Sequence, residues 1–176
     1  AVKGETFAEG YEAVRLIGKI LGCEDRAEAY IKECNKLLNL VKGRITHVQR
    51  NRRPRVLFLG PKGAYDVATG DMLQSAILSA AGAENVASGL KGRWPTVSPE
   101  QIVAWNPDVI FLGSGWGGFG ADKLLNNPQL KAVRAVRNRK VFDFPSNIGW
   151  WDFPAPHCAL CVVWAAKTLY PDRFMD

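Results

Sequence analysis

The segment Gly92–Phe111, with the sequence GRWPTVSPEQIVAWNPDVIF, contains a loop, a helix and a strand whose limits can be read residue by residue. Ser98 is suited to cap a helix because its hydroxyl accepts a free backbone N–H, and Pro99 has the φ angle that the first helical position requires. Asn106-Pro107 then ends the helix after about two turns, since proline cannot continue the hydrogen-bond ladder. The following run, Asp108–Gly113, is apolar on both faces, which is typical of a buried parallel strand.

Helical and extended patterns alternate on both sides of this segment. Apolar residues recur at three- and four-residue steps from Phe7 to Leu21, where Gly22 is placed to end a helix, and again over 27–48. Strands are predicted at 55–60, 85–86, 108–113 and 140–144, and further helices at 70–82, 128–136 and 154–170. This alternation predicts an α/β fold, a three-layer doubly wound parallel sheet in a Rossmann-like lobe, preceded by a long connecting helix.

The motif W-P-x-V-S-x-E-Q at 94–101, followed by N-P-D-V-I-F at 106–111, resembles the class III solute-binding proteins of bacterial and archaeal ABC importers. The similarity runs in register from Ile17–Gly22 through Ala80–Val86 to Trp164–Pro171. The resemblance implies two α/β lobes joined by one long helix. By this comparison, residues 1–54 are the connecting helical spine and residues 55–176 the C-terminal ligand-binding lobe, with the N-terminal lobe absent. Part of the apolar stripe of the spine should then face solvent, and we expect the isolated piece to self-associate.

The resemblance also implies a function. Members of this family carry cobalamin, ferric siderophores or haem to a membrane permease, so we expect a binding protein without an intrinsic cofactor and without enzymatic activity. The expected cargo is a metal chelate, and the expected location is periplasmic or extracytoplasmic, with or without a membrane anchor. Composition alone favours the cytoplasm, because Ala1–Glu5 lacks the basic-then-apolar order of a signal peptide. We follow the resemblance, in which an export signal would precede the first lobe.

Four of the six tryptophans fall in loops at or after predicted strand ends. Ligands of open α/β sheets bind at the carboxyl ends of strands, and an exposed indole can bury about 150 to 250 Å² against a planar or macrocyclic ligand. The alternative is that these rings pack on the absent lobe or inside their loops. The resemblance places ligand contacts at Trp94, Trp150 and Trp151, and also at Tyr65 and Trp116, with Asp152 as a polar contact or a surface turn residue.

Glu100 lies in the first turn of the helix predicted after Ser98, where the helix dipole stabilises a carboxylate. The resemblance implies a further role. Family members carry a glutamate at this place in the motif on each lobe, and the two glutamates dock against arginines of the permease. We therefore interpret Glu100 as a docking residue, with helix stabilisation alone as the alternative.

The formal net charge of +6 is concentrated near the start of the chain, since residues 1–55 hold 12 basic and 7 acidic side chains. The excess lies where the long helix runs into the first strand, at Lys42, Arg44, Arg50, Arg52, Arg53 and Arg55. No aromatic stacking residue is interleaved with these cations, so we interpret the segment as a solvated joint or a lobe-facing surface and not as a nucleic-acid site.

Two chemical motifs are weak. The sequence G-S-G-W-G-G at 113–118 matches G-x-G-x-x-G, but bulky Trp116 stands where a pyrophosphate needs open backbone, and Pro128 shortens the helix that follows. Cys158 and Cys161 beside His157 lack the second close pair that a zinc site needs, so we interpret them as ordinary helix-face cysteines. The open alternatives are a Rossmann-like nucleotide-binding enzyme domain and the docking half of a heteromeric complex.

Overall fold

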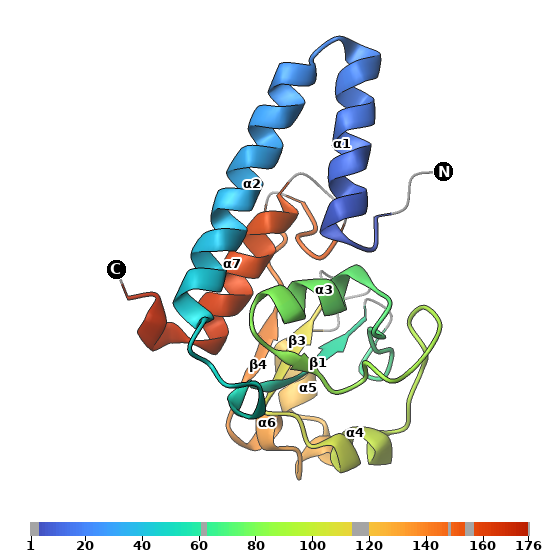
Figure 1. The fold of residues 1–176 in the computed structure, drawn as a ribbon. Coiled ribbons are helices and arrows are strands. Elements are labelled where there is room, and N and C mark those ends of the chain that lie inside the picture. Colours follow the sequence, from blue (N-terminus) through green and yellow to red (C-terminus); the bar gives the residue numbers. More distant parts are fainter. Residues whose placement is uncertain (1–3, 61–62, 114–119, 148, 154–156, 176) are drawn as a thin grey trace.

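A helical hairpin projects from an α/β lobe in the computed structural model, which describes residues 4–60, 63–113, 120–147, 149–153 and 157–175 (Figure 1). The hairpin consists of α1 (Phe7–Leu21) and α2 (Glu24–Ile45). Thr6 and Glu9 form a capping box that starts α1, and Gly22 ends it with a φ of 62°, a left-handed conformation that glycine adopts without strain. The predicted helix stop at Gly22 is confirmed.

The lobe is built on four parallel strands in the order β2-β1-β3-β4. The chain passes from β1 to β2 on one side and only later to β3 on the other, so the direction of winding reverses between β1 and β3. This is the doubly wound parallel sheet that the sequence predicts. The strands are β1 (Arg55–Leu59), β2 (Glu84–Asn85), β3 (Val109–Leu112) and β4 (Val141–Asp143).

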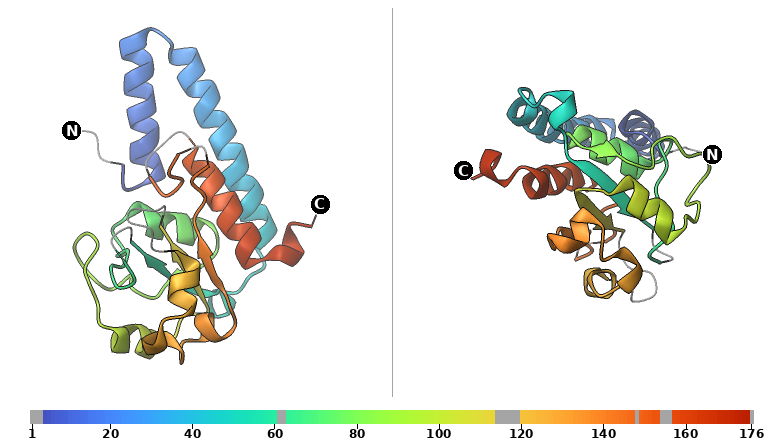
Figure 2. Two further views of the ribbon diagram at one scale, coloured as in Figure 1. Left: turned by 180° about the vertical axis from the view of Figure 1, so that it is seen from behind. Right: turned by 90° about the horizontal axis from the view of Figure 1, so that it is seen from below.

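Helices cover both faces of the sheet (Figure 2). Alternate side chains of the central strands enter two separate cores, one on each face. Val56, Phe58 and Phe111 pack with α2, α3 (Leu73–Ala80) and α7 (Cys158–Leu169). On the other face, Leu57, Leu59 and Ile110 pack with a second set of helices. These are α4 (Pro99–Trp105), α5 (Ala121–Leu125) and α6 (Arg134–Arg137). Strands that are buried on both faces explain the continuous apolar runs in the sequence.

The prediction of one continuous helix over 128–136 is wrong. A short 3₁₀ helix, η2 (Pro128–Leu130), is followed by Val133 in an extended conformation and then by α6. The backbone N–H of Arg134 donates to the Asn106 side chain at 2.8 Å, which ties α6 to the turn before β3. Two further 3₁₀ turns, η1 (Arg50–Arg52) and η3 (Pro171–Arg173), border the lobe.

The predicted boundaries of two other helices shift. α3 begins at Leu73 and not at the predicted Gly70. The backbone N–H of Leu73 donates to the Glu5 carboxylate at 3.1 Å. α7 begins at Cys158, and the predicted start at 154–156 lies outside the described residues. Among the described residues, no helix is long and apolar enough to cross a membrane.

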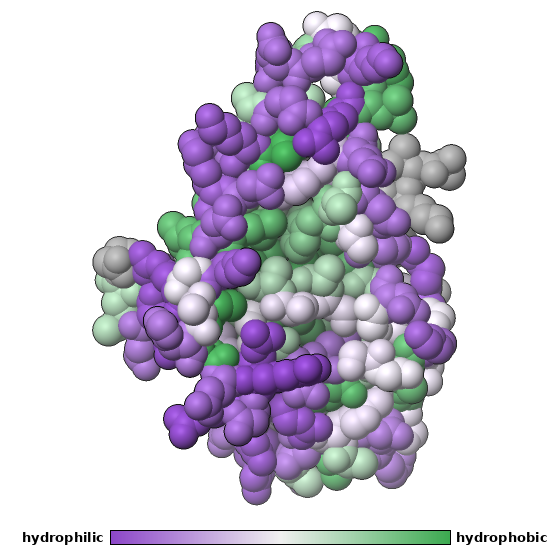
Figure 3. Space-filling view, in the orientation of Figure 1, coloured by the Kyte–Doolittle hydropathy of each residue, from purple (hydrophilic) through white to green (hydrophobic). Residues whose placement is uncertain are grey.

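An apolar stripe on the hairpin faces solvent, as expected. Figure 3 shows a small group of hydrophobic residues on the α1 side of the outer end of the hairpin, among hydrophilic ones. The stripe consists of Leu16, Ile17, Ile20 and Leu21 on α1 and Leu40 on α2, with exposed fractions from 45% to 72%. We call these five residues the hairpin stripe, and its self-association stays a prediction.

Candidate ligand-binding site

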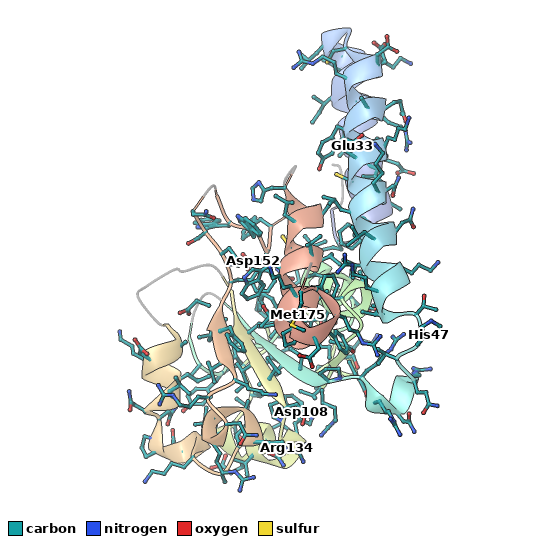
Figure 4. All side chains as sticks on the ribbon, turned by 90° about the vertical axis from the view of Figure 1, so that its left-hand side faces the viewer. Glu33, His47, Asp108, Arg134, Asp152 and Met175 are labelled. Carbon is teal, nitrogen blue, oxygen red and sulfur yellow. The ribbon has the colours of Figure 1, made fainter. Side chains whose placement is uncertain are left out.

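A buried carboxylate lies over the carboxyl ends of β1 and β3, where the winding of the sheet reverses. Asp152 is only 2% exposed, so it is not the surface turn residue of the alternative interpretation. Its Oδ2 would be 2.8 Å from a Cβ atom placed on Gly113, and the carbonyl oxygen of Leu59 would be 3.2 Å from the same atom. A side chain at Gly113 would therefore displace Asp152. Figure 4 shows Asp152 at this end of the sheet.

A hydrogen bond from α3 holds the loop that carries Asp152. The Gln74 side chain, 5% exposed, donates from Nε2 to the carbonyl oxygen of Asp152 at 2.8 Å. The second amide atom, Gln74 Oε1, is buried without a hydrogen-bond partner, and so is the indole Nε1 of Trp151. Unpaired buried polar atoms destabilise a fold by about 1 to 3 kcal/mol each, so they are typical of functional or water-filled sites.

Trp94 lies beside this carboxylate on the same face of the sheet. Its ring centroid is 6.3 Å from that of Phe58, and a Cβ atom on Gly60 would come within 2.5 Å of the indole Cε3. Gly60 therefore leaves the space that the indole occupies at the end of β1. The backbone of Trp94 has a φ of 50°, an uncommon conformation for a residue with a bulky side chain. The ring is half-buried, so the interpretation of Trp94 as packing inside the lobe is met in part.

The loop after β4 presents aromatic side chains of two kinds. Trp150 and Phe153 are 38% and 43% exposed, and their rings are in contact with centroids 5.1 Å apart and planes tilted by 53°. Trp151 is half-buried against the core, with its ring 6.2 Å from that of His157. The carbonyl oxygen of Trp150 is 3.1 Å from His157 Nε2, which ties the loop to the start of α7. Phe153 was not among the predicted site residues, although its place two residues after the tryptophan pair was a usable signal.

The predicted site residues are not all brought together. The Tyr65 hydroxyl donates to Gln129 at 2.7 Å and accepts from Asn127 at 3.0 Å, and its ring packs in the core on the other face of the sheet from Trp94. Trp116 and most of the glycine-rich motif at 113–118 lie outside the described residues. The described site therefore consists of Trp94, Trp150, Trp151 and Asp152, together with Phe153.

Glu100 is exposed in the first turn of α4, away from the aromatic loop. The predicted cap is present, because Ser98 Oγ accepts from the Gln101 N–H at 3.2 Å. A hydrogen bond from its own backbone N–H, followed by one from Ser98, lowers the pKa of the Glu100 carboxyl. At neutral pH the side chain is an outward-facing carboxylate held at a helix start.

The cysteines of α7 are protonated thiols inside the fold. Burial, and secondarily the nearby Cys34, raises the pKa of the Cys158 thiol to about 12, and burial also raises the pKa of the Cys161 thiol. In the described part of the chain, no three side chains of the types that ligate metals form a group.

Several known proteins are similar to this chain in fold and in sequence. The family model described as periplasmic binding protein matches residues 2–148. The chain belongs to the periplasmic binding protein family. Molybdate-binding protein MolA of Haemophilus influenzae is 30% identical to this periplasmic binding protein over 169 residues, which cover 94% of this chain and 46% of MolA. The class III resemblance inferred from the sequence motif is thereby confirmed.

Two further relatives agree with this assignment. High-affinity heme uptake system protein IsdE of Staphylococcus aureus is 30% identical over 131 residues, which cover 70% of this chain and 45% of IsdE. A periplasmic solute binding protein from Veillonella parvula superposes with a TM-score of 0.85 at 29% identity, covering 100% of this chain and 54% of the other. The chain thus spans about half the length of the relatives it matches.

Proposed function

We propose that this chain is the C-terminal half of the substrate-binding component of an ABC importer, located outside the cytoplasm and delivering its cargo to a membrane permease. Family membership and the position of the aromatic loop carry the proposal together. Trp94 and Asp152 lie at the carboxyl ends of β1 and β3, next to the winding reversal, where open α/β sheets bind ligands, and Trp150 belongs to the same loop as Asp152.

The cargo that fits this edge is a metal chelate, namely a ferric siderophore, haem or corrinoid. Trp150 and Phe153 expose two tilted rings whose apolar surface would be buried against the apolar part of such a ligand. Molybdate is the second candidate, because one relative is named for binding it. A small oxyanion would use hydrogen-bond donors and would leave the exposed rings unused, so the aromatic pair favours the chelate.

The other half of the cleft is proposed to be a second lobe that covers the hairpin stripe. The relatives are about twice as long as the matched region. The stripe is an exposed apolar surface, and such surfaces commonly mark contacts with another protein surface. A lobe on the hairpin would face the carboxyl ends of the strands across the site, so that ligand would be enclosed from both sides.

The cargo is identified from the natural protein purified without denaturation from its own source. Elemental analysis should give close to one transition-metal atom per protein, and the visible spectrum distinguishes haem, corrinoid and ferric chelates from colourless molybdate. Iron or cobalt with a matching spectrum would support the chelate, and molybdenum would support the oxyanion. A preparation that carries bound nucleotide and no metal would overturn the proposal in favour of a nucleotide-binding domain.

A further inference from the structure

A second groove opens at the amino ends of the strands, at the opposite end of the sheet from the aromatic loop. It has a volume of about 590 Å³ and is bordered by the starts of β1 and β4, by α6 and by the end of α7. Figure 4 shows Asp108 and Arg134 at this end and Asp152 at the other. We call it the amino-end groove, and neither its position nor its charge is explained by cargo binding.

The groove is strongly basic. Its lining includes five cationic side chains and two carboxylates, those of Glu84 and Asp108. The cations are Arg52, Arg53, Arg55, Arg134 and Lys140. The end of α7 also borders the groove, but the negative end of a helix dipole amounts to about half a charge and does not cancel this excess.

Internal contacts occupy some of these groups and leave the others available. Asp108 forms an ion pair with Arg134 and also accepts from the Arg55 backbone N–H at 2.9 Å, so its charge is used inside the fold. The Arg55 guanidinium donates to the carbonyl oxygen of Trp105 at 2.8 Å. Within the described residues, Arg52, Arg53 and Lys140 form no ion pair with a carboxylate.

Arg53 supplies an independent indication that an acceptor is missing. Its Nε is shielded from solvent and has no hydrogen-bond partner. A guanidinium nitrogen only donates, so an acceptor oxygen, from a ligand or from water, is what would satisfy it. Backbone donors at this edge are already used, since the N–H groups of Glu84, Asp108 and Ile110 bond to neighbouring carbonyls. Recognition would therefore come from side chains, and arginine forks match the geometry of phosphate oxygens.

We propose that the amino-end groove binds a phosphate group, contacted by Arg52, Arg53 and Lys140. The volume suits a phosphorylated small molecule or the headgroup of an anionic phospholipid, and the two sources share the same recognition chemistry. The site lies apart from the cargo site, so it stands or falls separately from the proposed transport function.

The test compares two charge-matched double variants of the natural protein. Arg52→Glu with Lys140→Glu changes exposed cations of the groove, and Arg26→Glu with Lys19→Glu makes the same change on exposed residues of the hairpin. Binding is measured at low and high salt with two probes. Inorganic phosphate is titrated directly, and vesicles of phosphatidylcholine with or without phosphatidylglycerol are tested by co-sedimentation. The groove variant should bind at least about tenfold more weakly, and the hairpin variant within about twofold of the parent.

Each outcome has a defined meaning. Phosphate binding without a preference for anionic vesicles supports a soluble ligand, and a preference for anionic vesicles supports a lipid headgroup. Equal weakening in both variants would show general charge attraction and would overturn the site. Absence of binding to both probes would overturn it as well. Thermal unfolding of all variants checks that the exposed substitutions leave the fold intact.

Discussion

Trp94 illustrates how one residue joins packing to function. Gly60, directly after β1, has no side chain, and the indole occupies the space beside it, in contact with Phe58, while Trp94 stays partly exposed. The ring is therefore held in place by the lobe and is still available to a ligand. Such a pre-positioned aromatic loses little conformational freedom on binding, which favours affinity.

Replacing Trp94 with alanine should weaken cargo binding by about 1 to 3 kcal/mol, because an aromatic contact is lost. Trp164→Ala is the matched control, since Trp164 packs between Phe111 and Phe144 at 5.2 and 4.8 Å. The control should lower the free energy of unfolding by about 2 to 4 kcal/mol and leave affinity unchanged. Calorimetric titration and denaturant unfolding measure the two quantities. Unchanged affinity in Trp94→Ala would make this ring purely structural.

Reversing the charge of Glu100 separates docking from helix stabilisation. Glu100→Lys should leave cargo affinity intact. If Glu100 docks on arginines of a permease, as the family resemblance implies, the reversed charge should also sharply reduce permease binding through like-charge repulsion. Asp122→Lys makes the same change in the first turn of α5 and should have no such effect. Permease pull-down and cargo uptake are the measurements. Normal uptake by Glu100→Lys would leave this carboxylate as a helix-start residue only.

Among the helices and strands, features that depend on neighbouring residues were predicted well from the sequence. Features that depend on contacts between distant residues were not. The Ser98 cap and the end of α4 at Asn106, which has a φ of 45°, depend on residues within one turn. The break between η2 and α6 depends on the Asn106 side chain, 28 residues earlier in the chain, so periodicity alone does not predict it.

The candidate site was predictable in the same limited way. The positions of Trp94 and Trp150 in loops after strands could be predicted, because strand ends are readable from the sequence. Whether a loop side chain points into the lobe depends on how the loop folds back. Asp152 is buried over Gly113 for that reason, and Tyr65 is directed to Asn127 and away from the tryptophans.

The hairpin stripe gives a prediction at this scale. The isolated 176-residue chain should self-associate, because exposed leucine and isoleucine side chains lose contact with water when two copies meet. Ile17→Lys with Ile20→Lys should restore a monomer, and Glu12→Lys, an exposed change elsewhere on α1, should not. Sedimentation velocity over a concentration series is the measurement. A strictly monomeric parent chain at high concentration would contradict the expectation.

In the whole molecule, we propose, the described site is one wall of a cleft between two lobes. A lobe that contributes half of the contacts leaves its ligand open to water on the other side. The contacts that remain must still offset the loss of translational and rotational freedom on binding. The affinity of the chain alone should therefore fall far below that of a protein with both lobes.

The most direct test is the dissociation constant of the identified cargo, measured by titration for the natural protein and for the 176-residue chain. A micromolar constant corresponds to about 8 kcal/mol, and losing half of the contacts should weaken binding by several powers of ten. Circular dichroism of the chain confirms that it is folded under the same conditions. A large difference between the two constants is the result that we predict, and equal constants would contradict the two-lobed cleft.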